Sequence, residues 1–124
     1  MNEKTKKIVG WVLAGALTAF IAFSAIGKLT GDPMPMDMLT GWGFTEGEVT
    51  LIGIGELLSV ILFLIPKTSS LGTLLMSAYF GGAIASHMQA EAPLDNYTFP
   101  SIILIVIWIT ALIRNPEIFS SFKK

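Results

Sequence analysis

Four long apolar stretches dominate this sequence and limit the folds that it can adopt. They cover residues 8–27, 49–65, 71–86 and 97–113, and Glu56 is the single charged residue within them. A helix needs about 20 apolar residues to cross the hydrocarbon core of a bilayer, within a range of about 17–25. With short extensions into their flanks, the stretches predict transmembrane helices at about residues 8–27, 46–65, 69–88 and 97–113. Together these helices predict one membrane domain of residues 1–124.

The overall composition agrees with a membrane protein. Hydrophobic residues make up 52% of the chain and charged residues 14%, whereas soluble domains carry about 25% charged residues. A soluble four-helix bundle would show polar residues every three to four positions, but these stretches are apolar on all sides. The net charge of −1 argues against binding to nucleic acid. The predicted fold class is all-α, an integral membrane four-helix transmembrane bundle with the lipid bilayer as its partner.

The first stretch has one alternative interpretation. Lys4, Lys6 and Lys7 precede it, and Ala22-Phe23-Ser24 resembles the cleavage site of a signal peptide. The apolar region of a signal peptide is about 7–15 residues long. Because this stretch is longer, the sequence favours a retained transmembrane helix.

The charged residues predict how the helices are oriented in the membrane. Seven of the eight Lys and Arg residues would lie on the side of the termini, and only Lys28 on the other. The seven are Lys4, Lys6, Lys7, Lys67, Arg114, Lys123 and Lys124. The opposite loops carry Asp32, Asp37, Glu46, Glu48, Glu91 and Asp95. The positive-inside rule then predicts that the N and C termini are both cytoplasmic.

The segment between the first two predicted helices is unusually apolar for a loop. Pro33 and Pro35 predict that it does not begin as a regular helix. Its apolar residues indicate either an interfacial segment anchored by Trp42 or a lid over the outer mouth of the bundle. The sequence Thr45-Glu-Gly-Glu48 has the form of a capping box, which predicts that the second transmembrane helix starts near Thr45.

Small residues indicate how the helices pack, because close approach drives helix association in lipid. Gly53, Glu56 and Ser59 share one helix face, which we expect to point into the bundle. The first helix and the third each carry small residues at four-residue spacing, which predicts that these two helices are neighbours. The spaced residues are Gly10, Ala14, Thr18 and Ala22 in the first helix, and Ser77, Gly81 and Ala85 in the third.

Five polar residues are candidates for ligand or proton binding: Glu56, Lys28, His87, Ser24 and Tyr79. A rise of about 1.5 Å per residue places Lys28 and His87 at the outer rim, under residues 34–44, and Glu56 near the midplane. A direct ion pair between Glu56 and Lys28 then requires a helix offset or a lysine that reaches downward. At the level of Glu56, the same count places the hydroxyl groups of Tyr79 and Thr18.

Each charged candidate also has a purely structural interpretation. Lys28 can extend its ammonium group to the interface, His87 can be an ordinary interfacial residue, and Glu56 can be a hydrogen-bonded packing residue. An ionisable side chain at bilayer depth costs about 2.5 kcal/mol or more, so a functional role for Glu56 is the strongest of the three. One histidine and no cysteine argue against a haem or zinc site, and no metal ligand or catalytic residue is assigned.

Several motifs in this chain resemble the DoxX-like family of small bacterial membrane proteins. The resemblance runs from about Val12 to Ile113, and its motifs are Phe23–Leu29, Gly53–Leu58, Leu71–Met76 and Gly81–His87. It implies a four-helix bundle in the bacterial inner membrane, with Lys28, Glu56 and His87 at the family's polar positions. The family is named after a small subunit of an archaeal quinol-oxidising system, which implies a quinone as a ligand and a redox protein as a partner.

The expected function is therefore that of a non-catalytic, multi-pass membrane protein. It would be a quinone- or lipid-binding subunit of a membrane redox complex, and a partner protein would carry out the electron transfer. Two alternatives remain open: a small oligomeric proton-coupled transporter or channel with Glu56 as its titrating group, and a structural or assembly factor of the membrane. A homo-oligomer is compatible with each of them.

Overall fold

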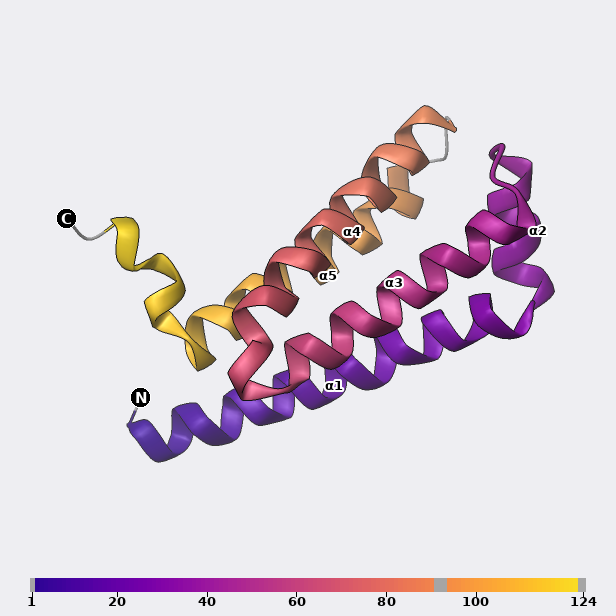
Figure 1. Cartoon of the computed structure of the whole chain (residues 1–124). Coiled ribbons are helices and arrows are strands. Elements are labelled where there is room, and N and C mark those ends of the chain that lie inside the picture. Colours follow the sequence, from indigo (N-terminus) through magenta and orange to yellow (C-terminus); the bar gives the residue numbers. More distant parts are fainter. Residues whose placement is uncertain (1, 91–93, 123–124) are drawn as a thin grey trace.

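A computed structural model describes residues 2–90 and 94–122 and is helical throughout its regular structure. Glu91, Lys123 and Lys124, which entered the charge pattern above, lie outside the described residues. The elements are α1 (Glu3–Thr30), α2 (Pro33–Gly41), α3 (Glu46–Leu64), η1 (Pro66–Thr68), α4 (Ser69–Gln89), α5 (Leu94–Arg114) and η2 (Pro116–Phe122) (Figure 1). The all-α prediction is confirmed, and the four apolar stretches lie in α1, α3, α4 and α5.

The four long helices form a ring in which each helix packs against two others. α1 packs along α3, α3 along α4, α4 along α5, and α5 returns to α1 (Figure 1). α1 and α4 are therefore diagonally opposite, and the prediction that they are neighbours is wrong. Of the predicted small-residue stripe of α4, Gly81 and Ala85 are exposed, and Ser77 contacts another helix, accepting a hydrogen bond from Trp108 Nε1 of α5 at 2.7 Å. The packed face of α4 instead carries Ser69, Gly72, Thr73, Met76 and Phe80.

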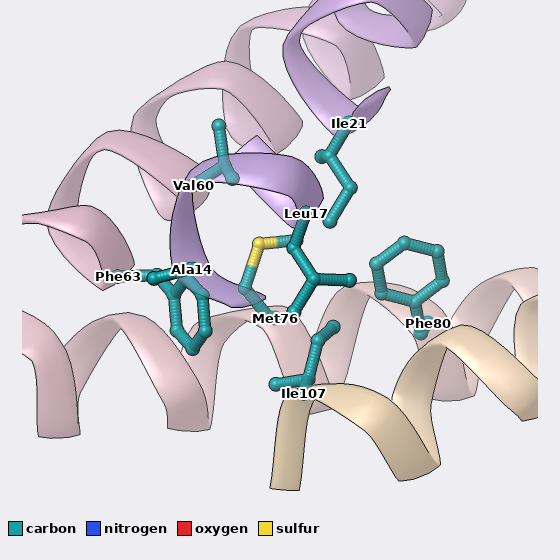
Figure 2. Packing of buried hydrophobic residues seen from close by; sticks show 8 residues of the cluster. All are labelled: Ala14, Leu17, Ile21, Val60, Phe63, Met76, Phe80 and Ile107. Carbon is teal, nitrogen blue, oxygen red and sulfur yellow. The ribbon is translucent and has the colours of Figure 1, made fainter. Parts of the chain in front are cut away.

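The centre of the bundle is an apolar cluster around the Met76 side chain (Figure 2). All four long helices contribute to it. Its buried members are Ala14, Leu17, Ile21, Val60, Phe63, Met76, Phe80 and Ile107. The Gly53, Glu56 and Ser59 face of α3 is buried, as the three-residue spacing predicted.

The outside of the bundle is rich in large apolar side chains. Phe23 is 79% exposed, Leu51 67% and Val12 64%, whereas soluble monomers rarely expose contiguous apolar surface of this kind. Among the described residues, three helices are long and apolar enough to cross a membrane: Glu3–Thr30, Glu46–Leu64 and Tyr97–Arg114. α4 is not among them, because serine, threonine and glycine lower its hydropathy. The chain is therefore a membrane protein with three helices that qualify as spans.

α2 corrects the prediction for the proline-rich segment. α1 ends at Thr30, and its C-cap Gly31 has a φ of 77°, which suits a residue without a side chain. α2 begins at Pro33, and the side chain of its N-cap Asp32 accepts a hydrogen bond from Met34 N. This helix tolerates the two prolines because they occupy its first turn, where backbone N–H groups have no helical partners. The predicted capping box is present: Thr45 Oγ1 accepts from Glu48 N at 3.1 Å, and Thr45 N donates to Glu48 Oε1 at 2.8 Å.

The two ends of the bundle are packed differently. We call the end with Glu3, Arg114 and the α3–α4 turn the terminal end, and the opposite end, which α2 covers, the α2 end. At the terminal end, a Cβ on Gly72 would lie 2.1 Å from Phe63 N, so α3 and α4 touch backbone to backbone. Arg114 there donates to the carbonyl oxygens of Phe63 at 3.0 Å and Leu64 at 2.8 Å, and so caps the last turn of α3.

Candidate functional site

A buried ion pair joins α1 and α3 on the α2 side of the apolar cluster. Lys28 Nζ lies 3.0 Å from Glu56 Oε1, and the side chains of Lys28 and Glu56 are 10% and 2% exposed. Lys28 Nζ also donates to Ser24 Oγ at 2.9 Å. Each charge is therefore paired within the apolar interior. Removing one partner of a buried ion pair costs on the order of 3–5 kcal/mol, because the other charge is left uncompensated.

The ion pair forms because Lys28 does not lie at the rim, where counting residues placed it. α1 begins at Glu3, before the apolar stretch, and extends past the α3–α4 turn (Figure 1). Lys28 consequently packs beside Gly53, where a Cβ would lie 3.0 Å from Lys28 Cβ and 3.2 Å from Ala25 O. Helical side chains point toward the helix N-terminus, so the lysine extends down one turn to the level of Glu56. Both conditions named for a direct pair, an offset and a downward lysine, are met.

Two hydroxyl groups had been expected near Glu56, and the structure separates them. The Lys28 ammonium nitrogen lies 6.0 Å from the centre of the Tyr79 ring, and the Tyr79 hydroxyl interacts with the Glu56 carboxyl. Thr18 does not take part: its hydroxyl is buried and has no hydrogen-bond partner among the described residues. The expectation for Thr18 is therefore wrong, because the same offset that lowers Lys28 moves Thr18 toward the terminal end.

His87 is held near the end of α4 by its own helix and by the segment after α2. His87 Nδ1 lies 2.6 Å from the carbonyl oxygen of Ala83. A carbonyl can only accept, so Nδ1 carries the proton, and Nε2 of the neutral ring is left as an acceptor. The Trp42 ring contacts the imidazole edge-on, with 4.6 Å between ring centres. Trp42 is therefore in contact with a helix of the bundle rather than serving only as an interfacial anchor.

A cavity of about 340 Å³ lies between α2, α3 and α4. Lys28, Tyr79 and His87 line it, together with apolar side chains of α2 and of the residues that follow it, which are Met38, Leu39, Trp42 and Phe44. Lys28 and His87, which come from diagonal helices, thus share one cavity under α2 and the residues that follow it. Ser24 and Glu56 are not part of the lining and lie behind Lys28.

The α4 wall of this cavity was predicted only in part, because the sequence indicated Tyr79 and His87 but not the four small residues beside them. It consists of Ala78, Tyr79, Gly82, Ala83, Ser86 and His87. Their spacing alternates between one and three, which places them on one face of a helix. The signal was available, because the small residues of this face leave open space beside Tyr79 and His87. The four-residue spacing of Ser77, Gly81 and Ala85 predicted that the adjacent face packs instead.

The cavity offers a matched pair of polar groups on apolar walls. A lysine ammonium has three N–H donors, of which Ser24 and Glu56 take two, while the ammonium-bearing side chain borders the cavity. The neutral His87 ring offers Nε2 as an acceptor. Within the described residues, no three His, Cys, Asp or Glu side chains are grouped to hold a metal ion. The geometry suits a small amphipathic molecule that carries a polar oxygen.

Comparison with known proteins identifies one family. The profile of the DoxX-like family matches residues 12–110, which is most of the chain. No curated protein and no solved structure matches the chain.

Proposed function

Because the chain belongs to the DoxX-like family, we propose that it is a membrane-embedded binding protein. Its ligand is a small amphipathic molecule with a carbonyl or anionic oxygen, a quinone or a lipid, and it binds in the cavity between α2, α3 and α4. The chain itself is non-catalytic and acts as a subunit of a membrane redox complex. A partner protein carries out the electron transfer.

The third donor of Lys28 is the observation that carries this proposal. Ser24 and Glu56 take two of the three N–H donors of the Lys28 ammonium group, and an oxygen atom of the ligand accepts from the third. Glu56 balances the charge of Lys28 and, with Ser24, fixes the direction of the ammonium group. The role of Glu56 is thus to position Lys28 rather than to contact the ligand itself.

The dimensions of the cavity agree with a ring-sized head group. Small-molecule pockets occupy about 300–1,000 Å³ and are mostly apolar with a few polar groups, and this cavity of about 340 Å³ lies at the lower end. A quinone ring has a carbonyl oxygen for Lys28, its reduced quinol form has a hydroxyl group that can donate to Nε2 of His87, and the isoprenoid tail fits the apolar exterior of the helices. When bound, such a molecule supplies the redox chemistry, while Lys28 and His87 hold and orient it.

Proton transport is less well supported for a single copy of the chain. On the terminal side of Glu56, the Met76 cluster fills the bundle with apolar side chains (Figure 2). A proton path through Glu56 would need polar groups or water along this region. The binding role requires access from the α2 end alone.

We further propose that α4 is a fourth span and that both termini are cytoplasmic, in the bacterial inner membrane. α4 has 21 residues, or about 31 Å at the helical rise of about 1.5 Å per residue, and it packs between α3 and α5. Reporter fusions at Lys67 and after Arg114 are expected to report the cytoplasm, and a fusion at Asp37 the outside. Reporters at Lys67 and after Arg114 on opposite faces would rule out α4 as a span, and both reporters on the outer face would contradict cytoplasmic termini.

Two glycines of α4 allow a matched test of the cavity. A side chain at Gly82 or Gly81 would meet nothing within 4 Å, but only Gly82 lines the cavity. The full chain is purified in mild detergent, and retained lipids and quinones are measured by mass spectrometry. Gly82→Leu is expected to lower retention at least about tenfold, the effect of 1.4 kcal/mol, while Gly81→Leu retains the ligand.

Equal retention in the two variants would contradict the cavity as the binding site. If neither the unaltered chain nor the variants hold a lipid or quinone above the detergent background, the structural role is favoured instead. In that case Lys28 and Glu56 serve packing alone.

A further inference from the structure

A second concave surface lies at the terminal end, away from the Lys28 cavity. It is a groove of about 930 Å³ between the beginning of α1, the η1 turn and the end of α5. Lys6, Lys7 and Arg114 line it, with one opposing carboxylate from Glu3.

The positive charge of the groove is available to a ligand. Among the described residues of the lining, Glu3 is the only carboxylate. It is 95% exposed and its contact with Lys6 spans 3.8 Å, so water and salt weaken this contact. Lys7 is exposed. The Arg114 guanidinium has five N–H donors, and two of its nitrogens each donate one hydrogen bond to an α3 carbonyl. Arg114 lines the groove, and a guanidinium with donors to spare suits a bidentate oxyanion such as phosphate.

The apolar part of the same groove distinguishes a lipid from a free anion. Trp11 is 43% exposed and Leu112 is 52% exposed, and both line the groove below the cations. Trp11 also packs on the Arg114 guanidinium at 5.1 Å. Tryptophan favours the level of the lipid head groups, and basic pockets between membrane helices suit anionic head groups. A free phosphate would use the cations but not these apolar walls.

We propose that this groove is a binding site for an anionic phospholipid. The head-group phosphate lies between Lys6, Lys7 and Arg114, and an acyl chain runs along Trp11 and Leu112 between α1 and α5. The site is separate from the cavity at the α2 end. Loss of one is therefore expected to leave the other intact.

Two double variants test the proposal with equal changes of charge. Lys6→Gln/Lys7→Gln removes two cations of the groove, while Lys4→Gln/Lys67→Gln removes two cations of the same end that do not line it. The full chain in mild detergent is titrated with phosphatidylglycerol or with phosphatidylcholine of the same acyl chains, and bound lipid is counted by native mass spectrometry. Inorganic phosphate is added as a competitor in a parallel titration.

We expect phosphatidylglycerol to bind at least about tenfold more tightly than phosphatidylcholine, because three basic residues of the groove attract its net negative head group. Lys6→Gln/Lys7→Gln should lose this preference, and Lys4→Gln/Lys67→Gln should retain it within about twofold. Equal losses in both variants would reduce the effect to general charge and overturn the site. Displacement of phosphatidylglycerol by inorganic phosphate at matching concentrations would overturn the lipid as its occupant.

Discussion

The two ends of the bundle solve the same physical problem in different ways. Each end places a cation inside an apolar protein. At the α2 end, Lys28 is balanced by the carboxylate of Glu56 and faces a cavity. At the terminal end, Arg114 is balanced by the carbonyl oxygens that end α3, where the helix dipole is negative.

The two ends also differ in how closely α3 and α4 approach each other inside the bundle. The terminal end is closed by backbone contact, since Gly72 allows α4 to touch the backbone of α3. The α2 end is held open, because Ala78, Gly82 and Ala83 leave space between α3 and α4. A packed end can fix the geometry of the helices, while a spacious end with one unassigned lysine donor can accept a ligand. The predictions below test this division, from the largest expected effect to the smallest.

The largest effect is expected from Gly72→Ala at the terminal end. The new Cβ would lie 2.1 Å from Phe63 N and 2.4 Å from Phe63 Cα, so the helices must move apart, at an expected cost of about 3 kcal/mol or more. Thermal unfolding in detergent measures the loss of stability. Gly81→Ala on the same helix meets nothing within 4 Å and should unfold as the unaltered chain does. Similar stabilities for the two variants would refute the close contact.

Breaking the ion pair at the α2 end comes next. Glu56→Leu leaves Lys28 buried without its counter-charge and should lower the free energy of unfolding by about 3 kcal/mol. The double variant Lys28→Met/Glu56→Leu removes both charges and should recover most of this loss. Denaturation of the single and double variants gives the coupling energy directly. Additive losses would mean that the two side chains act independently and would contradict the pair.

A smaller loss is expected when the cap of α3 is removed. Arg114→Met deletes two hydrogen bonds from a charged group to Phe63 O and Leu64 O, which should cost about 2 kcal/mol. The carbonyls lie at the end of a helix and can find water, so the loss should be less than for Glu56→Leu. Lys67→Met removes a charge from the turn that follows α3 without removing such bonds, and it should cost less than about 0.5 kcal/mol. If Arg114→Met is neutral, the cap does not contribute to stability.

The smallest effect is expected for the hydroxyl group that orients Lys28. Ser24→Ala removes one acceptor of the ammonium group and should cost about 1 kcal/mol. It should also weaken retention of the cavity ligand, because Lys28 gains freedom to turn. The matched change Ser59→Ala removes a bond only to Gly55 O of its own helix and should leave retention unchanged. Retention that falls equally in both variants would show that Ser24 acts through stability alone.

Much of the candidate site was visible in the sequence. Glu56 is conspicuous because it is charged within an apolar stretch, and its face with Gly53 and Ser59 follows from helical spacing alone. Ser24 and Lys28 are one turn apart, so their contact needs no tertiary information. The Thr45 capping box is likewise local. These features depend on neighbours in the chain, which is why they could be read from it.

Other features depend on how far one helix is displaced along another. Counting about 1.5 Å per residue placed Lys28 at the rim, because this count starts all helices at one level. The contact of Gly53 with Ala25 and Lys28 sets the actual register of α1 and α3. The hydrogen bonds of Arg114 could not be predicted from local patterns, because its partners Phe63 and Leu64 are distant in the chain.

The sequence by itself determined the membrane class, the helical segments and the polar residues that require burial. Apolar length and periodicity are local properties, and the bilayer imposes them on any chain. The tertiary structure alone decided which helices are neighbours, which of two small-residue faces of α4 packs, and that Lys28 pairs with Glu56. Each of these outcomes depends on contact between surfaces from different helices. Close packing selects among alternatives that local patterns leave equivalent.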